Sequence, residues 1–290
     1  MLTFVLLCLV ARFGYSLNDI FIGRLARKHG RMEVAAFRGS SLGLSMAPWL
    51  LLVPATAWAG LAAHWPQLLL TVSVTALANI LQLHAVRYLP FGLRAALMLS
   101  TMATCSVLLG WFLLGEHLSV REVGLGAILI ASAVAVALGS HVVQDISPNI
   151  PRGAALTLLS ATLMACAVFG VKHLARAAHP LLAAWAWEFG SGLVLLGPVL
   201  WRGRAAALSG TGTRFRSIAI ASLPTALASG ASVLALDFGE LGLWGALGGT
   251  QILFTAFLGA AWHQETLGLR RWLCMVVTVA AIAGLAFARG

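Results

Sequence analysis

The chain has 290 residues, of which 60% are hydrophobic and only 10% are charged, and its mean hydropathy is +0.93. A soluble domain carries about 25% charged residues, so this composition excludes a soluble globular protein. The formal net charge is +10, but the Lys and Arg residues lie mainly in short connections between apolar runs. That placement is typical of membrane anchors and leaves no basic face for nucleic acid.

Apolar runs of about 20 residues, the length that crosses a bilayer as a helix, recur along the whole chain. We expect ten membrane helices, at about residues 2–22, 33–53, 66–88, 91–114, 120–139, 153–174, 180–201, 216–236, 241–262 and 269–287. The first run lacks the basic start and the small-residue cleavage site of a signal peptide, so we expect a membrane helix there. Residues 141–152 contain two prolines and an acid, and they are predicted to link domain 1–140 to domain 153–290.

The two halves of the chain repeat one another. The segment GRLARKHG at 23–30 matches KHLARAAH at 172–179, and Glu116 matches Glu265, each pair 149 residues apart. Because each half has an odd number of crossings, about five, the second half must insert upside down relative to the first. Inverted repeats of this kind are typical of secondary transporters, which bind their solute between the halves. The expected fold is therefore an all-α polytopic membrane protein built from two inverted five-helix repeats.

Four stretches resemble a known family. They are VRYLPFGLRAALM at 86–98, LLGEHLS at 113–119, GAILIASAVAVAL at 126–138 and KHLARAAHPLLAAWAWEFGSGLVLL at 172–196. Together they resemble the drug/metabolite transporter superfamily, in its EamA-type branch, over essentially the whole chain. The resemblance implies a ten-helix, multi-pass transporter in the cell membrane (the inner membrane if the source is bacterial), with both termini in the cytoplasm.

Two of the expected helices carry a polar stripe along one face. The first stripe, in 66–88, consists of Thr71, Thr75, Asn79 and Gln82. The second, in 216–236, consists of Ser222, Thr225, Ser229 and Ser232. Spacings of three and four residues place each stripe on one side of its helix. The stripes could form hydrogen bonds between helices or line a polar cavity, and their recurrence in both halves favours a shared solute cavity.

Further candidates for solute binding lie in other expected helices. They are Tyr15 and Asn18 in the first helix, the matched pair Thr101 and Thr250, Gln251, and Trp187. Trp187 lies deeper than interface tryptophans do and could stack an aromatic solute, with core packing as the favoured alternative.

Arg38 and Glu188 occupy corresponding places in the two halves, 150 residues apart. Charges inside apolar runs are costly and point to function, so both are candidates for coupling or gating. Glu188 is the candidate for proton coupling, because a desolvated carboxylate tends to take up a proton. An internal ion pair, or Arg38 reaching to the membrane interface, is the alternative. Beside Arg38, the spacing of Gly39 and Gly43 permits a close helix contact.

Ser119 and Glu122 fit a capping box at the start of the helix expected from Val120. Glu116, just upstream, could pair with Arg121 or face a helix N-terminus, and this structural role is favoured over a gate at the pore mouth.

The remaining polar residues form no reactive set. Asp237 and Glu240 are expected to bracket a solvated turn, and Lys172 lies near the end of a segment. The four cysteines lie singly in apolar runs, and no His, Cys and Asp cluster has the spacing of a metal site. No phosphate-binding loop occurs. We therefore expect no metal, no cofactor and no enzymatic activity.

The expected function is secondary active transport of a small organic metabolite, an amino-acid-, drug- or nucleotide-derived solute, by alternating access and in the direction of export. Protons are the candidate coupling ion. Membrane lipids are the other expected partners, without nucleic acid, and the protein is expected to be a monomer or homodimer. A flippase for a lipid-linked or amphiphilic substrate is the alternative, and an intramembrane lipid-modifying enzyme is less favoured.

Two predictions of the orientation in the membrane disagree. One side of the expected topology holds Arg24, Arg27, Lys28, Arg31, Arg87, Arg94, Arg152, Arg202, Arg204, Arg214, Arg216, Arg270 and Arg271. The other holds Arg121, Lys172, Arg176 and Arg289. Since basic connections favour the cytoplasm, the charge count predicts that both termini are outside, whereas the resemblance implies that both are inside.

Overall fold

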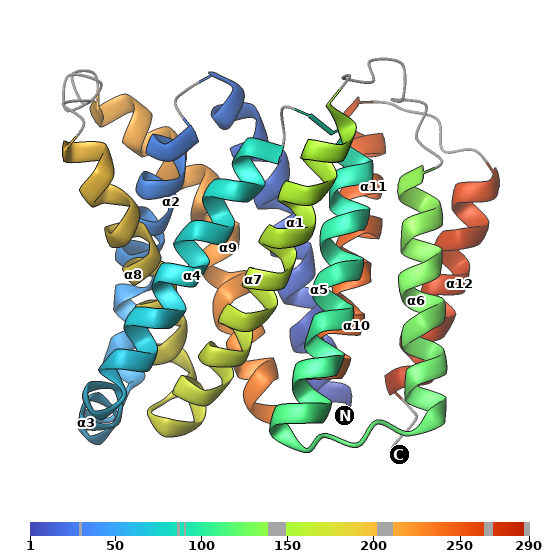
Figure 1. The fold of residues 1–290 in the computed structure, drawn as a ribbon, viewed down its shortest axis with the longest axis horizontal. Helices are drawn as coiled ribbons and strands as arrows, with labels where there is room; N and C mark the ends of the chain where they lie inside the picture. Colours follow the sequence, from blue (N-terminus) through green and yellow to red (C-terminus); the bar gives the residue numbers. More distant parts are fainter. Residues whose placement is uncertain are drawn as a thin grey trace.

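The computed structural model describes residues 1–28, 31–85, 88–89, 91–138, 149–201, 211–263 and 269–286 (Figure 1). Every element within these ranges is helical. The elements are α1 (Leu2–Lys28), α2 (Arg31–Met46), η1 (Ala47–Leu52), α3 (Ala55–Ala63), α4 (Trp65–Ala85), α5 (Phe91–Leu114), α6 (Val120–Leu138), α7 (Ile150–Ala177), α8 (Pro180–Trp201), α9 (Thr211–Phe238), α10 (Leu241–Ala246), η4 (Leu247–Gly249), α11 (Thr250–His263) and α12 (Leu269–Ala286).

The second expected helix ends earlier than predicted. Helix α2 stops at Met46, and the chain continues as the 3₁₀ turn η1, which has Pro48 in its first turn. Proline has no N–H to donate to the preceding turn, which disfavours a regular α-helix at this point, although α8 and α9 accommodate Pro198 and Pro224 within them. Pro54 then precedes α3, a nine-residue helix that was not predicted because it is too short to cross a bilayer.

The ninth expected helix is broken in the middle. Residues 241–262 form α10, the short 3₁₀ turn η4 and α11 in place of one continuous helix. Gly245, Gly248 and Gly249 fall at the break, where glycine favours the helical conformation less than any other residue except proline. Gly245 also packs against α5, since an added Cβ would lie 2.7 Å from Cβ of Ser106 and 3.1 Å from Cα of Ala103.

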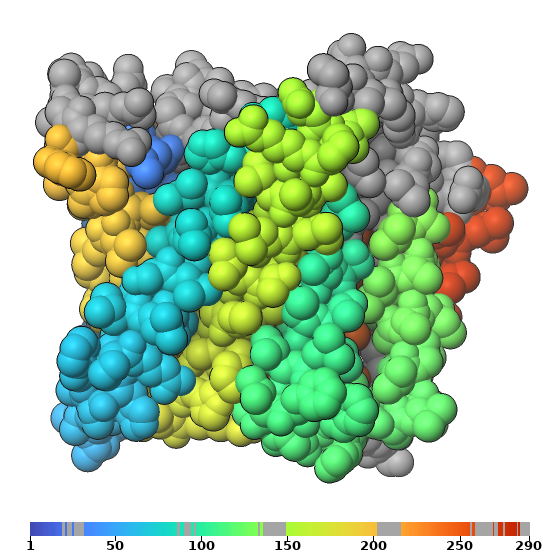
Figure 2. Space-filling view, in the orientation of Figure 1, coloured from blue at the N-terminus to red at the C-terminus, as the bar shows by residue number. Residues whose placement is uncertain are grey.

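Helices of the two halves interleave. Helix α1 packs on α9 and α4 packs on α7, while α5 contacts α7 and α1 contacts α11. In the repeat, α1 corresponds to α7, α4 to α9 and α5 to α10–α11. The α1–α9 contact is then equivalent to the α4–α7 contact, and the α5–α7 contact is equivalent to the α1–α11 contact. The pairs α2–α8 and α6–α12 join corresponding helices directly. Figure 2 shows this mixing on one face, where α7 of the second half lies between α4 and α5 of the first. The contacts therefore follow a pseudo-two-fold arrangement of two repeats.

The repeats run in opposite directions, as expected. Helix α1 begins at the lower edge of Figure 1, whereas α7 begins at the upper edge. By length and composition, five of the described helical segments can cross a membrane, namely Trp65–Ala85, Leu97–Leu114, Ile150–Ala177, Pro180–Trp201 and Arg216–Phe238. The all-helical, polytopic membrane fold is thereby confirmed. Glu265 and most of the expected linker 141–152 lie outside the described residues.

The predicted close contact at Gly39 and Gly43 is confirmed. A Cβ on Gly39 would lie 2.5 Å from Cα of Gly192 in α8, so the backbones of α2 and α8 touch there. A Cβ on Gly43 would overlap the ring of Phe189. Small residues at both positions let α2 and α8 approach closely just beside Arg38 and Glu188.

Candidate functional site

Three predicted site residues from three different helices meet in the interior. Ser229 Oγ of α9 donates a hydrogen bond to Oε1 of Glu188 in α8 at 2.5 Å. The same Ser229 Oγ lies 3.2 Å from the Tyr15 hydroxyl of α1. Because the single hydroxyl proton of Ser229 is used toward Glu188, Tyr15 must be the donor in the second bond. Glu188 is only 4% exposed, so this chain of hydrogen bonds, which we name the central cluster (Tyr15, Glu188, Ser229), is buried.

A second buried bond extends this polar region toward α4. Trp187 Nε1 donates to Thr75 Oγ1 at 2.7 Å, and Thr75 Oγ1 in turn donates to the Thr71 carbonyl oxygen at 2.8 Å. Trp187 is therefore both packed in the core and hydrogen-bonded to one of the predicted stripes. The indole N–H supplies a donor that the apolar ring alone would not suggest.

Ser232 holds a tryptophan that the sequence did not single out. Trp244 Nε1 of α10 donates to Ser232 Oγ at 3.1 Å. The Arg12 guanidinium of α1 lies 4.1 Å above the centre of the Trp244 ring, and Arg12 Nη2 donates to the Trp244 carbonyl oxygen at 3.0 Å. A cation over an indole face is attracted by the ring, so α1, α9 and α10 are joined around Trp244.

The two predicted stripes differ in depth. All four members of the second stripe are buried, and among the described residues Ser222 donates to the Ile218 carbonyl oxygen of its own helix. In the first stripe Thr71 and Thr75 are buried, whereas Asn79 and Gln82 are half-buried. Ser229, Ser232 and Thr75 bond to other helices, so the interhelical reading of the stripes holds for these three residues in this conformation.

The other predicted binding residues lie in α1, α5 and α11. Thr250 is buried and donates to the Leu247 carbonyl oxygen, while the Gln251 carbonyl oxygen accepts from Ser16 Oγ at 2.9 Å. Thr101 is half-buried in α5. Asn18 is buried in α1, and its Oδ1 has no hydrogen-bond partner within the described part of the chain.

Arg38 does not pair with Glu188. The two helices that carry them are in contact, yet among the described residues no ion pair joins the two side chains. Arg38 is half-buried, and its Nε has no hydrogen-bond partner in the described ranges. The internal ion pair considered from the sequence is therefore wrong for this conformation.

A charged cluster closes one end of the bundle. Lys172 Nζ of α7 lies 2.5 Å from Glu116 Oε1 and donates to the Gly239 carbonyl oxygen at 2.9 Å. Glu116 also accepts from the backbone N–H groups of Leu241 at 2.9 Å and Gly242 at 3.2 Å. The side chains of Lys172 and Glu116 are only 1% and 9% exposed. We name Glu116, Lys172 and these backbone groups the terminal cluster, because it lies at the end where α1 begins.

The prediction that Glu116 has a structural role facing a helix N-terminus agrees with its contacts, but the predicted partner, Arg121, is wrong. The carboxylate faces a helix N-terminus, as one alternative held, but that helix is α10 of the other half, and Lys172 replaces Arg121 as the paired cation. The predicted capping box is confirmed: the Ser119 backbone N–H donates to Glu122 Oε2 at 2.7 Å, and the Glu122 N–H donates to Ser119 Oγ at 3.2 Å.

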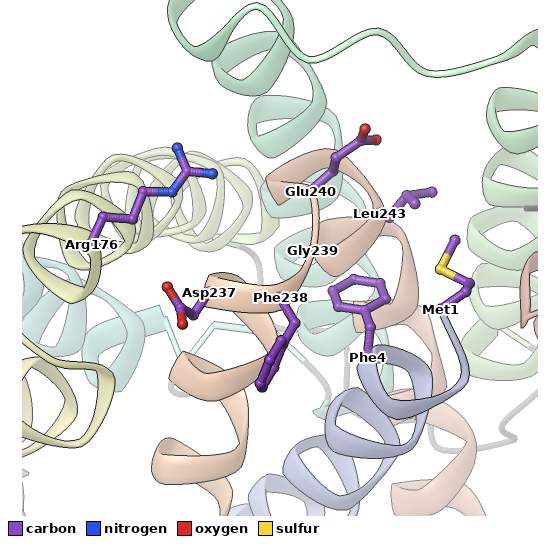
Figure 3. A pocket seen from close by; sticks show the side chains of 8 residues that line it. All are labelled: Met1, Phe4, Arg176, Asp237, Phe238, Gly239, Glu240 and Leu243. Carbon is purple, nitrogen blue, oxygen red and sulfur yellow. The ribbon is translucent and has the colours of Figure 1, made fainter.

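A cavity of about 370 Å³ opens at the same end (Figure 3). It is lined by Met1, Phe4, Arg176, Asp237, Phe238, Gly239, Glu240 and Leu243. Asp237 and Glu240 were expected to bracket a solvated turn, and they flank one that lines this cavity. Gly239 connects the cavity to the terminal cluster through its bond to Lys172. No group of three or more potential metal ligands occurs among the described residues.

Comparison with known families decides the identity of the fold. A family model described as "EamA-like transporter family" matches residues 2–139 and, a second time, residues 151–287. The chain belongs to the EamA-like transporter family. It contains two copies of the family's domain, is an integral multi-pass membrane transporter of small solutes, and is not an enzyme. The exact division at residues 140 and 153 stays a prediction.

One solved structure gives the same fold for this EamA-like transporter. A chain described only as "Crystal structure of protein" superposes with a TM-score of 0.75 over 98% of this chain and 95% of the other, at 13% sequence identity. At that identity the likeness speaks for the fold alone. A comparison with curated protein sequences finds no match.

The sequence did not predict the interhelical bonds of three residues in this EamA-like transporter, although Arg12 shares a helical face with Tyr15 and was considered as lining the cavity or reaching the interface. Arg12, Trp244 and Lys172 are buried, and each bonds across helices. The signal was available for Arg12 and Lys172, because a cation within an apolar segment needs a partner inside the protein. Trp244 had no such signal, since tryptophan is apolar by composition and its role depends on the break after α10.

Proposed function

We propose that this EamA-like transporter is a secondary active transporter that exchanges a small organic solute for protons by alternating access. The solute would be amino-acid-, drug- or nucleotide-derived, and export would be its direction. The observation that carries the proposal is the central cluster, in which one buried carboxylate is bonded to a hydroxyl shared with a third helix.

Protonation of Glu188 would change the bonds that hold the cluster together. An ionised carboxylate only accepts, whereas a protonated one also donates. On protonation the Ser229 hydroxyl would no longer be committed to Glu188 as a donor, and the bond from Tyr15 could reverse. Because Tyr15, Glu188 and Ser229 belong to α1, α8 and α9, one proton would alter contacts among three helices. This is the link between proton binding and conformation that a proton-coupled transporter needs.

The same polar groups supply a solute site when the helices separate. Tyr15, Thr75, Trp187, Ser229 and Ser232 satisfy one another across helices in this conformation. When such a bond opens, its donor and acceptor must find new partners, since leaving them unpaired in an apolar interior is costly. A polar solute can provide those partners. Asn18 Oδ1 adds a buried acceptor whose bonding within the described residues is unsatisfied.

Alternating access also needs a contact at one end that can break. The terminal cluster fits, because Glu116 of the first half holds Lys172 and the start of α10, which belong to the second. Opening that end would separate these groups and hydrate both charges. The moving bodies would be interleaved helix pairs such as α1–α9 and α4–α7, because the two sequence halves are not separate units.

The test is solute uptake into proteoliposomes containing the purified full chain. An inside-acid pH gradient should drive saturable uptake of at least one solute from a panel of radiolabelled amino acids, nucleosides and cationic drugs. Glu188→Gln should abolish the effect of the gradient but retain exchange of labelled for unlabelled solute, because the other polar groups of the proposed solute site remain while the proposed proton acceptor is removed.

The matched control is Glu33→Gln, a carboxyl in the first turn of α2, which should keep gradient-driven uptake. Gradient-driven uptake that survives Glu188→Gln would overturn the coupling role. Absence of saturable uptake for every solute class, with correctly folded protein, would overturn the proposed substrate range.

A further inference from the structure

Arg12 carries a positive charge into the interior of the bundle. It lies within the apolar segment Leu2–Asn18 of α1 and is only 2% exposed. Lys172, a similarly buried cation, is paired with Glu116, whereas no ion pair of Arg12 occurs among the residues that the structure describes. A buried charge without a partner is costly and points to a function.

The contacts of Arg12 leave its guanidinium incompletely bonded. A guanidinium has five N–H donors, and Nη2 uses one of them on the Trp244 carbonyl oxygen at 3.0 Å. The charge also lies 4.1 Å above the centre of the Trp244 ring. Nε has no hydrogen-bond partner within the described ranges. Because the carbonyl and the ring are both neutral, they hold the side chain in place but do not balance its charge, and one donor stays unused.

The guanidinium lies between the break after α10 and the polar residues of the interior. A Cβ on Gly248 of η4 would lie 3.6 Å from Nη2 and 3.7 Å from Cζ of Arg12, so the space between them has room for an added carbon. Tyr15 of the central cluster is three residues further along α1, on the same side of the helix. Trp244, which contacts Arg12, donates to Ser232 of the second stripe. Arg12 therefore borders the proposed solute site.

The chemistry of this position favours one kind of ligand group. Adjacent N–H groups of a guanidinium bind the two oxygens of a carboxylate or phosphate in parallel, and Nε–H is one such donor. One cation balances one negative charge, and the carboxylate of Glu188 in the same interior opposes a second. A singly charged carboxylate therefore fits better than a doubly charged phosphate.

We propose that Arg12 binds the carboxylate group of the transported solute. The transporter would then select monocarboxylates, amino acids among them, over nucleosides and cationic drugs. This inference rests on the part of the proposed function that places the solute among the polar residues of the interior, and it does not depend on proton coupling. In the absence of solute, the Trp244 carbonyl and ring keep the guanidinium in place.

The first test measures ligand binding to the purified full chain in detergent, by the shift of its thermal midpoint with ligand concentration. The probes are matched pairs: the common L-amino acids and aliphatic and aromatic monocarboxylates, each beside its own carboxamide. Adenosine and adenosine monophosphate form a further pair for phosphate. We expect at least one carboxylate to bind saturably and its carboxamide to bind about ten-fold more weakly or not at all.

Equal binding of carboxylate and carboxamide would overturn the proposal, and so would the absence of binding by every carboxylate. Binding of adenosine monophosphate but of no carboxylate would assign a phosphate to the site and would equally overturn it. Failure of the proposed proton exchange gives a different result, because gradient-driven uptake would then be missing while the preference for carboxylates persisted.

The second test uses Arg12→Lys, which keeps the charge but removes the paired donors. The matched control is Arg121→Lys, at an exposed position in the first turn of α6. Arg12→Lys should weaken binding of the carboxylate by about ten-fold and reduce its preference over the carboxamide, whereas Arg121→Lys should change neither. A purely structural role of Arg12 would lower the thermal midpoint without changing that preference, and this result would overturn the proposal. Where Arg12→Lys does not fold, the matched pairs on the unaltered chain decide alone.

Discussion

At the scale of single residues, Ser229 links the other two members of the central cluster by hydrogen bonds. Its hydroxyl donates to Glu188 and accepts from Tyr15, so one oxygen links α8, α9 and α1. Ser222, two turns earlier on the same helix, is equally buried, and within the described residues its hydroxyl donates to a backbone carbonyl of its own helix. The two serines therefore form a natural pair for testing whether an interhelical bond or mere burial of a hydroxyl matters.

Ser229→Ala should lower the free energy of unfolding by about 1–3 kcal/mol, because it leaves the buried Glu188 carboxylate without this donor. It should also lower solute flux, since the bond that connects proton binding to helix position is lost. Ser222→Ala should change neither by a measurable amount. Thermal unfolding in detergent and uptake in proteoliposomes measure the two effects, and equal behaviour of the two variants would contradict the role of Ser229.

The terminal cluster also depends on individual charges. Removing one member of a buried ion pair costs about 3–5 kcal/mol, because the remaining charge stays buried without compensation. Lys172→Met should therefore destabilise the protein strongly, and adding Glu116→Gln to it should restore part of the loss. Arg176→Met, at an exposed position one turn further along α7, is the control and should have little effect. A loss for Lys172→Met no larger than for Arg176→Met would contradict the cluster.

At the scale of helices, the contact of α2 with α8 depends on glycine. Gly39 meets Gly192 backbone to backbone, so α2 and α8 cannot accommodate a methyl group there without moving apart. The polar residues beside the contact, Arg38 and Glu188, are positioned by this approach. Gly197, on the same helix α8, has open space around it.

Gly39→Ala should destabilise the protein by about 1–3 kcal/mol, as overpacking does in a close-packed interior. Gly197→Ala should instead stabilise it slightly, by at most about 1 kcal/mol, because alanine favours the helix more than glycine. The shift of the thermal midpoint in detergent checks both. A neutral Gly39→Ala would show that α2 and α8 do not need this approach.

The sequence predicted the helices and the repeats more completely than the helix breaks and the contacts between helices. The apolar runs and the 149-residue offset depend only on periodicity, and they predicted the crossing helices and their inversion. The break at Gly245, Gly248 and Gly249 was missed because an apolar run hides a local loss of helix propensity. The partner of Glu116 was missed because it lies on another half of the chain, and spacing along the sequence carries no information about such distant contacts.

The individual residues of the candidate site could be predicted from the sequence, but the contacts between them could not. Glu188 stood out as a charge in an apolar run, and Ser229 as a member of a helical stripe. Their direct bond depends on how α8 and α9 pack, which periodicity does not determine. The ion pair considered between Arg38 and Glu188 is wrong, because correspondence between the halves identifies equivalent positions and does not show that they are in contact.

At the scale of the whole molecule, the helices of the two sequence halves pack against each other throughout the part of the chain that the structure describes. The most extensive helix contacts join the first half to the second, and α7 lies between two helices of the first half (Figure 2). A conformational change must therefore rearrange helix pairs, with the central cluster in the middle and the terminal cluster at one end. Whether the protein acts as a monomer or homodimer stays a prediction.

The central claim is that the terminal end opens and closes in response to protonation in the interior. Spin labels introduced by His117→Cys and Ala178→Cys, in a chain freed of its native cysteines, would report the distance across that end in nanodiscs. We predict two populated distances whose ratio changes with pH, and loss of that pH dependence in Glu188→Gln. A single distance that neither pH nor Glu188→Gln alters would contradict the account.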